Sequence, residues 1–113
     1  MKEHILKYIE LSPNMGYYDL VKIFGLSMKE LLNLLDITNY KIYGDETYFE
    51  VYDNNGNEIY YEDLNNFWIK SKYDANGRLI YEEFSSGDWY KYEYDVNGKK
   101  IYFEDSDGEK TYY

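Results

Sequence analysis

Residues 48–113 of this chain repeat themselves every 21 residues, and this repeat limits the folds that the chain can adopt. Four short motifs return three times each at that interval, without an insertion. They are Tyr-Asp from 52, 73 and 94, Asn-Gly from 55, 76 and 97, Ile-Tyr from 59, 80 and 101, and Glu at 62, 83 and 104. Agreement across several residue types indicates internal repetition. The richness in Tyr, Ile and Phe favours strands over helices.

Each repeat contains two tight turns. The first turn reads Asp-x-Asn-Gly at 53–56, 74–77 and 95–98, and the second occupies 63–66, 84–87 and 105–108. Asp at the first position accepts hydrogen bonds from the turn amides, and Gly at the fourth adopts a positive φ, which is typical of a type I turn with a G1 bulge. Asn66 takes the place of Gly in one turn, since Asn tolerates the left-handed region. The turns therefore predict hairpins.

The spacing of the turns leaves strands of about six residues in an antiparallel meander. We predict seven strands, near 47–52, 58–62, 68–73, 79–83, 89–94, 100–104 and 110–113, and a weaker one at 38–43. Strict alternation places Ile59, Ile80 and Ile101, with Tyr61 and Phe103, on the core face. It places Tyr60, Tyr81 and Tyr102, beside Glu62, Glu83 and Glu104, on the opposite face, which we expect to be open to solvent.

The N-terminal part of the chain has helical periodicity instead. Apolar residues predict a helix over about 2–11, ended by Ser12-Pro13-Asn14, and a second over about 17–24, ended by Gly25. A third helix starts at the capping box Ser27-Met-Lys-Glu30. The sequence thus predicts an α+β fold, with a three-helix cap at 1–40 and an antiparallel sheet at 41–113.

Residues 18–35 resemble a helix-turn-helix. The exposed positions of the third helix offer Met28, Lys29, Glu30 and Asn33, with a single cation. A DNA reader needs Arg or Lys for phosphates and guanine, so a plain helical cap is favoured. A DNA-binding regulator that dimerises through the sheet remains an alternative.

Charge is unevenly distributed along the chain. The 12 Lys and Arg and 22 Asp and Glu give a net charge of -10, and the chain has no Cys. Residues 1–44 are balanced, whereas 45–113 hold 7 basic and 17 acidic residues. Such acidity repels nucleic acid and anionic membranes and attracts basic partners. No apolar run approaches the roughly 20 residues of a membrane span. We therefore expect a cytoplasmic protein with a basic protein partner, no direct nucleic acid and no membrane.

The repeat resembles the YD-repeat proteins, a family of bacterial shell and wall-associated chains. Residues 72–79 (Lys-Tyr-Asp-Ala-Asn-Gly-Arg-Leu) and 92–99 (Tyr-Glu-Tyr-Asp-Val-Asn-Gly-Lys) carry the likeness, which covers about 48–113. Long members of that family build extended β-structures that enclose toxins or bind carbohydrate. The present chain differs in having three units. Its Tyr-Asp-x-Asn-Gly style is also similar to that of short phage and prophage proteins.

Catalytic chemistry has little support in the sequence. His4 is the single His, and it lies in a helix with no Cys or Ser–Asp arrangement near it. The Glu62, Glu83 and Glu104 row lacks the cleft that a glycosidase requires. The oxygen-rich turns at 53–57 and 105–109 place Gly at the fourth position, whereas an EF-hand loop needs it at the sixth. The sequence predicts a non-enzymatic protein without cofactor or metal.

An acidic, aromatic sheet face is suited to binding a basic protein surface in place of a nucleic acid. We expect the partner-binding residues to be Tyr60, Glu62, Trp68, Tyr81, Glu83, Trp89, Tyr102 and Glu104. This predicts a small phage or mobile-element inhibitor, similar to an anti-CRISPR, that blocks a nucleic-acid-handling host protein. A carbohydrate-binding sheet with Trp68 and Trp89 as stacking platforms is a further alternative. The last strand, Thr111-Tyr-Tyr113, could pair with a second copy in a homodimer.

Overall fold

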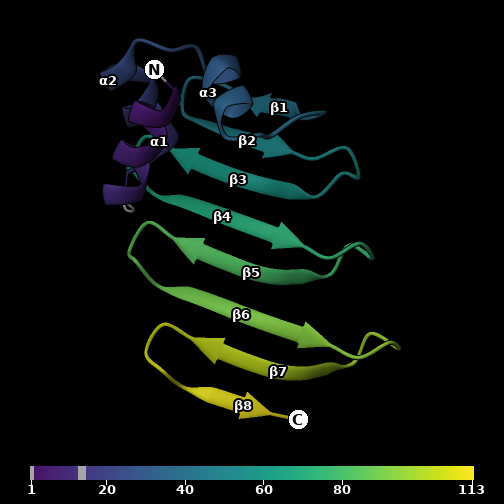
Figure 1. The fold of residues 1–113 in the computed structure, drawn as a ribbon. Helices are drawn as coiled ribbons and strands as arrows, with labels where there is room; N and C mark the ends of the chain where they lie inside the picture. The colour runs from purple at the N-terminus through teal and green to yellow at the C-terminus, as the bar shows by residue number, and fades with distance from the viewer. Residues whose placement is uncertain (1, 13–14) are drawn as a thin grey trace.

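The computed structural model describes residues 2–12 and 15–113, and it shows three helices followed by one antiparallel sheet (Figure 1). The helices are α1 (Lys2–Leu11), α2 (Tyr17–Phe24) and α3 (Met28–Leu34). The strands are β1 (Lys41–Gly44), β2 (Tyr48–Tyr52), β3 (Glu58–Asp63), β4 (Trp68–Tyr73), β5 (Leu79–Phe84), β6 (Trp89–Tyr94), β7 (Lys100–Asp105) and β8 (Lys110–Tyr112). They pair in chain order as a meander, which confirms the predicted fold class.

The helix ends are formed by the predicted residues where the structure describes them. Gly25 adopts φ 63° and its amide donates to the Val21 carbonyl. The Ser27 hydroxyl accepts from the Glu30 amide at 3.1 Å, and the Glu30 carboxylate accepts from the Ser27 amide at 3.0 Å. The predicted stop at Pro13 and Asn14 lies outside the described residues. The weaker strand predicted at 38–43 corresponds to β1, which begins at residue 41.

Both turn types form as predicted. Asp53 Oδ1 accepts from the amides of Asn55 and Asn57, each at 2.9 Å, and Gly56 adopts φ 83°. The turns that begin at Asp74 and Asp95 have the same hydrogen bonds. In the second series the positive φ angles are 61° at Asn66, 97° at Gly87 and 87° at Gly108. The 21-residue repeat is therefore a structural repeat of two hairpins.

A β-bulge that the sequence did not reveal lies at the Ile of every Ile-Tyr pair. Tyr52 pairs with Glu58 and Val51 pairs with Tyr60, so Ile59 has no partner in the register. The register shifts in the same way around Ile80 and Ile101. Because the extra residue interrupts the alternation, the Ile and the Tyr after it point to the same face of the sheet.

The three helices pack on that face, over β1–β4, and β5–β8 extend beyond them (Figure 1). Tyr60 and Glu62 are each 1% exposed beneath the helices. Their core neighbours are Tyr17, Leu20, Leu31, Leu32, Phe49, Val51 and Trp68, with Ile59 packed against them. The expected place of Ile59 on the core face is confirmed, whereas our expectation that the Tyr–Glu pairs lie on the opposite, solvent-open face was wrong. Ile and Tyr share one face, and the helices cover its first repeat, while Ile101 at the far end is 43% exposed.

The other face of the sheet carries a chain of touching aromatic rings. Tyr61 and Phe103, which we expected on the core face, belong to this chain. Neighbouring ring centroids lie 5.5–6.4 Å apart through Tyr48, Tyr61, Phe67, Phe84, Tyr90, Phe103 and Tyr92. Such aromatic pairs add packing energy across strands. They hold the sheet together where no helix covers it.

Candidate protein-binding surface

A hydrogen-bonded Tyr–Glu pair recurs on the helix-bearing face of each repeat. The hydroxyls of Tyr60, Tyr81 and Tyr102 donate to Oε1 of Glu62, Glu83 and Glu104 at 2.6, 2.8 and 2.9 Å. The two residues of each pair are two positions apart, so their side chains lie on the same face of the strand. The repeat thus presents one polar unit three times across the sheet.

The first Tyr–Glu pair holds the N-terminus of α2. The Tyr17 amide donates to the Tyr60 hydroxyl at 3.0 Å, and the Tyr18 amide donates to Glu62 Oε1 at 3.2 Å. The N-cap residue, Gly16, has no side chain that could cap the helix. The sheet therefore supplies acceptors for amides that the helix leaves free, and it places a carboxylate at the positive end of the helix dipole.

Aromatic rings and a lysine surround this first pair. The Tyr17 ring stacks on the Tyr60 ring with centroids 3.7 Å apart and an angle of 6°. On the next strand, the Trp68 ring lies 6.4 Å from Tyr60 at 22°. Lys70 Nζ lies 4.6 Å from the Trp68 ring centroid and 5.5 Å from that of Tyr17. The result is a buried stack of rings with a cation beside it.

The second repeat keeps the Tyr–Glu pair, the tryptophan ring and the lysine without a helix on them. It has Lys70 and Lys72 at the positions of Phe49 and Val51. The Trp89 ring lies 6.4 Å from the Tyr81 ring at 28°, and Lys91 Nζ lies 4.8 Å from the Trp89 centroid. Lys72 Nζ lies 5.6 Å from the Tyr81 centroid. Tyr81, Glu83 and Trp89 are half-buried and Lys91 is exposed. The second site is thus preformed by the sheet itself.

The third repeat keeps the Tyr–Glu pair and loses the ring beside it. The position equivalent to Trp89 is occupied by Lys110, and the Tyr102 ring contacts Tyr112 at 5.0 Å instead. The third repeat therefore lacks the tryptophan and the lysine beside it that the first two repeats share.

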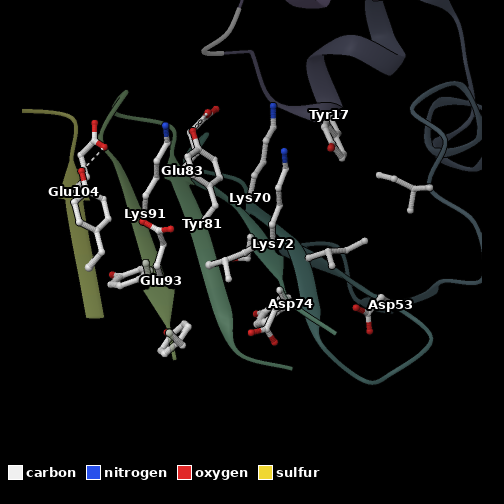
Figure 2. Close-up of a pocket in the computed structure, with 18 residues that line it drawn as sticks. Tyr17, Asp53, Lys70, Lys72, Asp74, Tyr81, Glu83, Lys91, Glu93 and Glu104 are labelled. Atoms are coloured by element: carbon white, nitrogen blue, oxygen red, sulfur yellow. Dashed lines mark hydrogen bonds between the residues drawn. The ribbon is translucent and has the colours of Figure 1, made fainter. Parts of the chain in front are cut away.

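The uncovered units line one groove beside the start of α2 (Figure 2). Figure 2 shows Tyr17 at one side, Lys70, Lys72 and Lys91 rising from the strands between the pairs, and Glu104 at the other side. The groove has a volume of about 1320 Å³. Ile59 and Ile80 also line it, which agrees with their place on the Tyr–Glu face.

Ionisation in the groove follows from burial and from neighbouring charges. Burial raises the pKa of Tyr81 and of Tyr102 to about 12. The hydrogen-bonded carboxylate of each pair, Glu83 beside Tyr81 and Glu104 beside Tyr102, adds to the shift. Burial also raises the pKa of Glu62 and lowers the pKa of the Lys70 ammonium. At neutral pH both tyrosine hydroxyls are therefore protonated and act as donors to the carboxylates.

The eight residues predicted to bind a partner all lie on this face, in two groups. Tyr60, Glu62 and Trp68 are each 1% exposed, so our expectation that this face is open to solvent was wrong for the first repeat. The reason is physical, since α2 docks on them. Tyr81, Glu83, Trp89, Tyr102 and Glu104 lie on the uncovered part of the face, where partner binding stays a prediction.

Sequence reasoning missed Gly16, Tyr17, Lys70 and Lys91. Trp-x-Lys recurs at 68–70 and 89–91, so the 21-residue interval could have identified both lysines. Gly16 precedes α2 in place of the usual Ser, Thr, Asp or Asn cap. An uncapped start indicates that the acceptors come from elsewhere in the fold, although it does not say from where.

Other candidate sites gain no support from the described residues. His4, Lys29, Glu30 and Asn33 are exposed, whereas Leu31 and Leu32 of α3 are buried against the sheet. Among the described residues, 2–12 and 15–113, no group of three or more His, Cys, Asp and Glu side chains is arranged to hold a metal ion. Within the same residues, no helix has both the length and the apolar character to span a membrane.

No protein-family model matches the sequence, and no curated protein is detectably similar to it. A functional interpretation therefore rests on the geometry alone.

Proposed function

We propose that this chain is a non-enzymatic protein-binding protein that docks on a basic protein surface through the uncovered half of its sheet. The carrying observation is the repeat of the α2-binding unit at Tyr81 and Glu83, where no helix covers it. The first copy of that unit already binds a protein segment within the chain. This supports protein, rather than DNA or carbohydrate, as the ligand of the second.

The charge of the uncovered half supports a basic partner. Residues 79–113 hold nine acidic and four basic residues, for a net charge of -5. On the groove face, lysines alternate with glutamates, since Lys91 stands opposite Glu104 and Glu104 opposite Lys110. The acidic residues that no lysine balances therefore lie around the groove, in the turns and on the opposite face of the sheet. An acidic field of this kind steers basic partners towards the surface.

The aromatic residues support a specific contact in addition to this steering. Tyr and Trp contribute most to protein interfaces, because they cover a large area and lose little conformational entropy. A small acidic protein with such a surface is suited to blocking the basic groove of a nucleic-acid-handling protein. We therefore propose inhibition of such a host protein as the specific role.

The direct test is affinity capture from a native host lysate with the immobilised full chain. The test variant is Glu83→Lys with Glu104→Lys, on the groove. Its control, Glu10→Lys with Glu46→Lys, makes the same change in net charge at exposed positions away from the groove. We expect the wild type and the control to retain a basic protein and the groove variant to lose it. Salt at about 0.5 M should release the protein from the wild type. Equal capture by both variants, or capture insensitive to salt, would contradict the proposal.

A further inference from the structure

The proposed function can be taken one step further, to the kind of segment that the second repeat binds. We propose that Tyr81, Glu83, Trp89 and Lys91 form a receptor for the N-terminus of an α-helix in a partner protein. The helix begins with a glycine followed by an aromatic residue. This inference rests on the proposed function, because it names the part of the partner that enters the groove.

The ligand is inferred from the first repeat, where the same unit is occupied. There the glycine at the N-cap of α2 and the two residues after it meet the sheet. Tyr17 supplies an amide for the tyrosine hydroxyl and a ring for stacking, and Tyr18 supplies an amide for the carboxylate. Each of these contacts uses a group that any helix start of this kind would carry.

The second repeat reproduces the receptor side of those contacts closely. The Tyr–Glu hydrogen bond is 2.8 Å long, against 2.6 Å in the first repeat. The Tyr–Trp centroid distance is 6.4 Å in both repeats, and the lysine lies 4.8 Å from its tryptophan ring, against 4.6 Å. A receptor that already has its bound geometry binds without the cost of ordering its own side chains.

Charge and space define what the receptor selects. The Glu83 carboxylate complements the partial positive charge at a helix N-terminus. In the first repeat, a Cβ added to Gly16 would lie 2.7 Å from Glu62 Oε2, so glycine is the residue that fits at the N-cap without displacing the carboxylate. The stacking surface of Tyr81 and the cation of Lys91 favour an aromatic ring immediately after that glycine.

The receptor is continuous with the interface that α2 already makes. Tyr17 and Lys70 of that interface line the same groove as Tyr81, Glu83 and Lys91 (Figure 2). The helices lie over β1–β4 and leave β5–β7 uncovered (Figure 1). The groove is lined by residues from β4 to β7, so it extends over these uncovered strands. The third repeat lacks the tryptophan, which leaves the second repeat as the principal site.

The test uses a peptide that copies α2. The probe is an N-acetylated peptide of residues 15–26 that carries Ile23→Lys, at an exposed position of α2, so that a lactam can join this amine to the carboxylate of Asp19. The lactam holds the peptide helical, because so short a helix is unstable in water. It is titrated into the ¹⁵N-labelled full chain, and binding is followed by NMR shifts. We expect shifts at Tyr81, Glu83, Trp89 and Lys91, with a Kd on the order of 1 mM or tighter.

Matched variants decide the outcome. Glu83→Gln should weaken peptide binding at least about tenfold, whereas Glu46→Gln, at an exposed position away from the groove, should change it less than about threefold. Peptides with Gly16→Ala or Tyr17→Ala should also lose binding. No shifts up to about 5 mM, shifts confined to the first repeat, or equal losses in Glu83→Gln and Glu46→Gln would overturn the inference.

The two proposals fail separately. Capture of a basic protein that depends on the groove, together with a peptide that does not bind, would overturn the helix-start receptor and leave the proposed function standing. Peptide binding that follows the expected pattern, together with failed capture, would support the receptor and contradict the proposed function.

Discussion

Gly16 lies directly against the carboxylate of Glu62, so that a Cβ on residue 16 would stand 2.7 Å from Oε2 and 2.9 Å from Cδ. The φ of Gly16 is -76°, which any residue can adopt. Contact with the sheet, and not backbone conformation, therefore requires glycine at this position. The contact joins the helical cap to the first repeat at its most closely packed point.

Gly16→Ala should destabilise the fold by about 1–3 kcal/mol, because the buried carboxylate cannot move away without breaking its hydrogen bonds. The measurement is urea unfolding followed by circular dichroism. In a Glu62→Ala background the cost of Gly16→Ala should fall by at least about 1 kcal/mol, since the opposing atoms are gone. Additive costs in this double-mutant cycle would show that the two residues do not meet.

Glu62→Gln should cost about 1 kcal/mol of unfolding free energy, since glutamine has one acceptor oxygen in place of two for the Tyr60 hydroxyl and the amides at the start of α2. Glu83→Gln is the matched control, because Glu83 makes the same hydrogen bond with its tyrosine and caps no helix. It should change stability by less than about 0.5 kcal/mol. Equal urea midpoints for the two variants would contradict the role of Glu62 as the cap.

Asn66→Gly should stabilise the chain by about 0.5–1 kcal/mol, because position 66 has φ 61° and glycine adopts this conformation without strain. The reverse change at the equivalent turn position, Gly87→Asn, should destabilise it by a similar amount. Thermal unfolding measures the change in stability of both variants. A stabilising Gly87→Asn would show that the two turns differ more than their backbones indicate.

Stability should fall as pH rises through neutrality, because of one residue on the face opposite the groove. Burial and the neighbouring Glu50 carboxylate raise the pKa of Glu58 to about 7. The Tyr52 hydroxyl bridges the two carboxylates. The folded chain therefore holds a proton on Glu58 that the unfolded chain, with the ordinary value of 4.5, has released. This stabilisation is complete below about pH 4.5 and is lost as pH rises through about 7.

The measurement compares the unfolding free energy at pH 5.5 and at pH 8, for the wild type and for Glu58→Gln. Glutamine cannot ionise, so the unfolding free energy of the variant should change less between the two pH values than that of the wild type. The difference should be a few tenths of a kcal/mol to about 1 kcal/mol, because Glu58 is partly exposed and solvent screens its charge. A pH dependence that is identical in both proteins would contradict the raised pKa.

The repeat, the turns and the helix caps could be predicted because each depends on residues close together in the chain. Asp53 and Gly56 define their turn locally, and Ser27 and Glu30 cap α3 within four positions. The face of the Ile-Tyr pair could not be predicted in the same way. Alternation assumes a regular strand, and the bulge at Ile59 is visible only in its pairing with β2.

The candidate surface could be predicted in part for a related reason. The eight residues share a face because the 21-residue interval places equivalent strands in equivalent positions. Burial of Tyr60, Glu62 and Trp68 depends instead on a helix more than 40 positions away in the chain, and no local pattern encodes where that helix docks.

The central claim is that a partner protein docks on the groove face of the uncovered strands. Site-specific photo-crosslinking tests it most directly, with a photoreactive phenylalanine at Trp89, which stacks beside Tyr81 on the groove face, at Tyr90 on the opposite face, or at Tyr43 on β1, which is 54% exposed. We predict a crosslinked partner from position 89 and none from position 43. Crosslinks from position 90 alone, or from position 43 as strongly as from position 89, would contradict the claim.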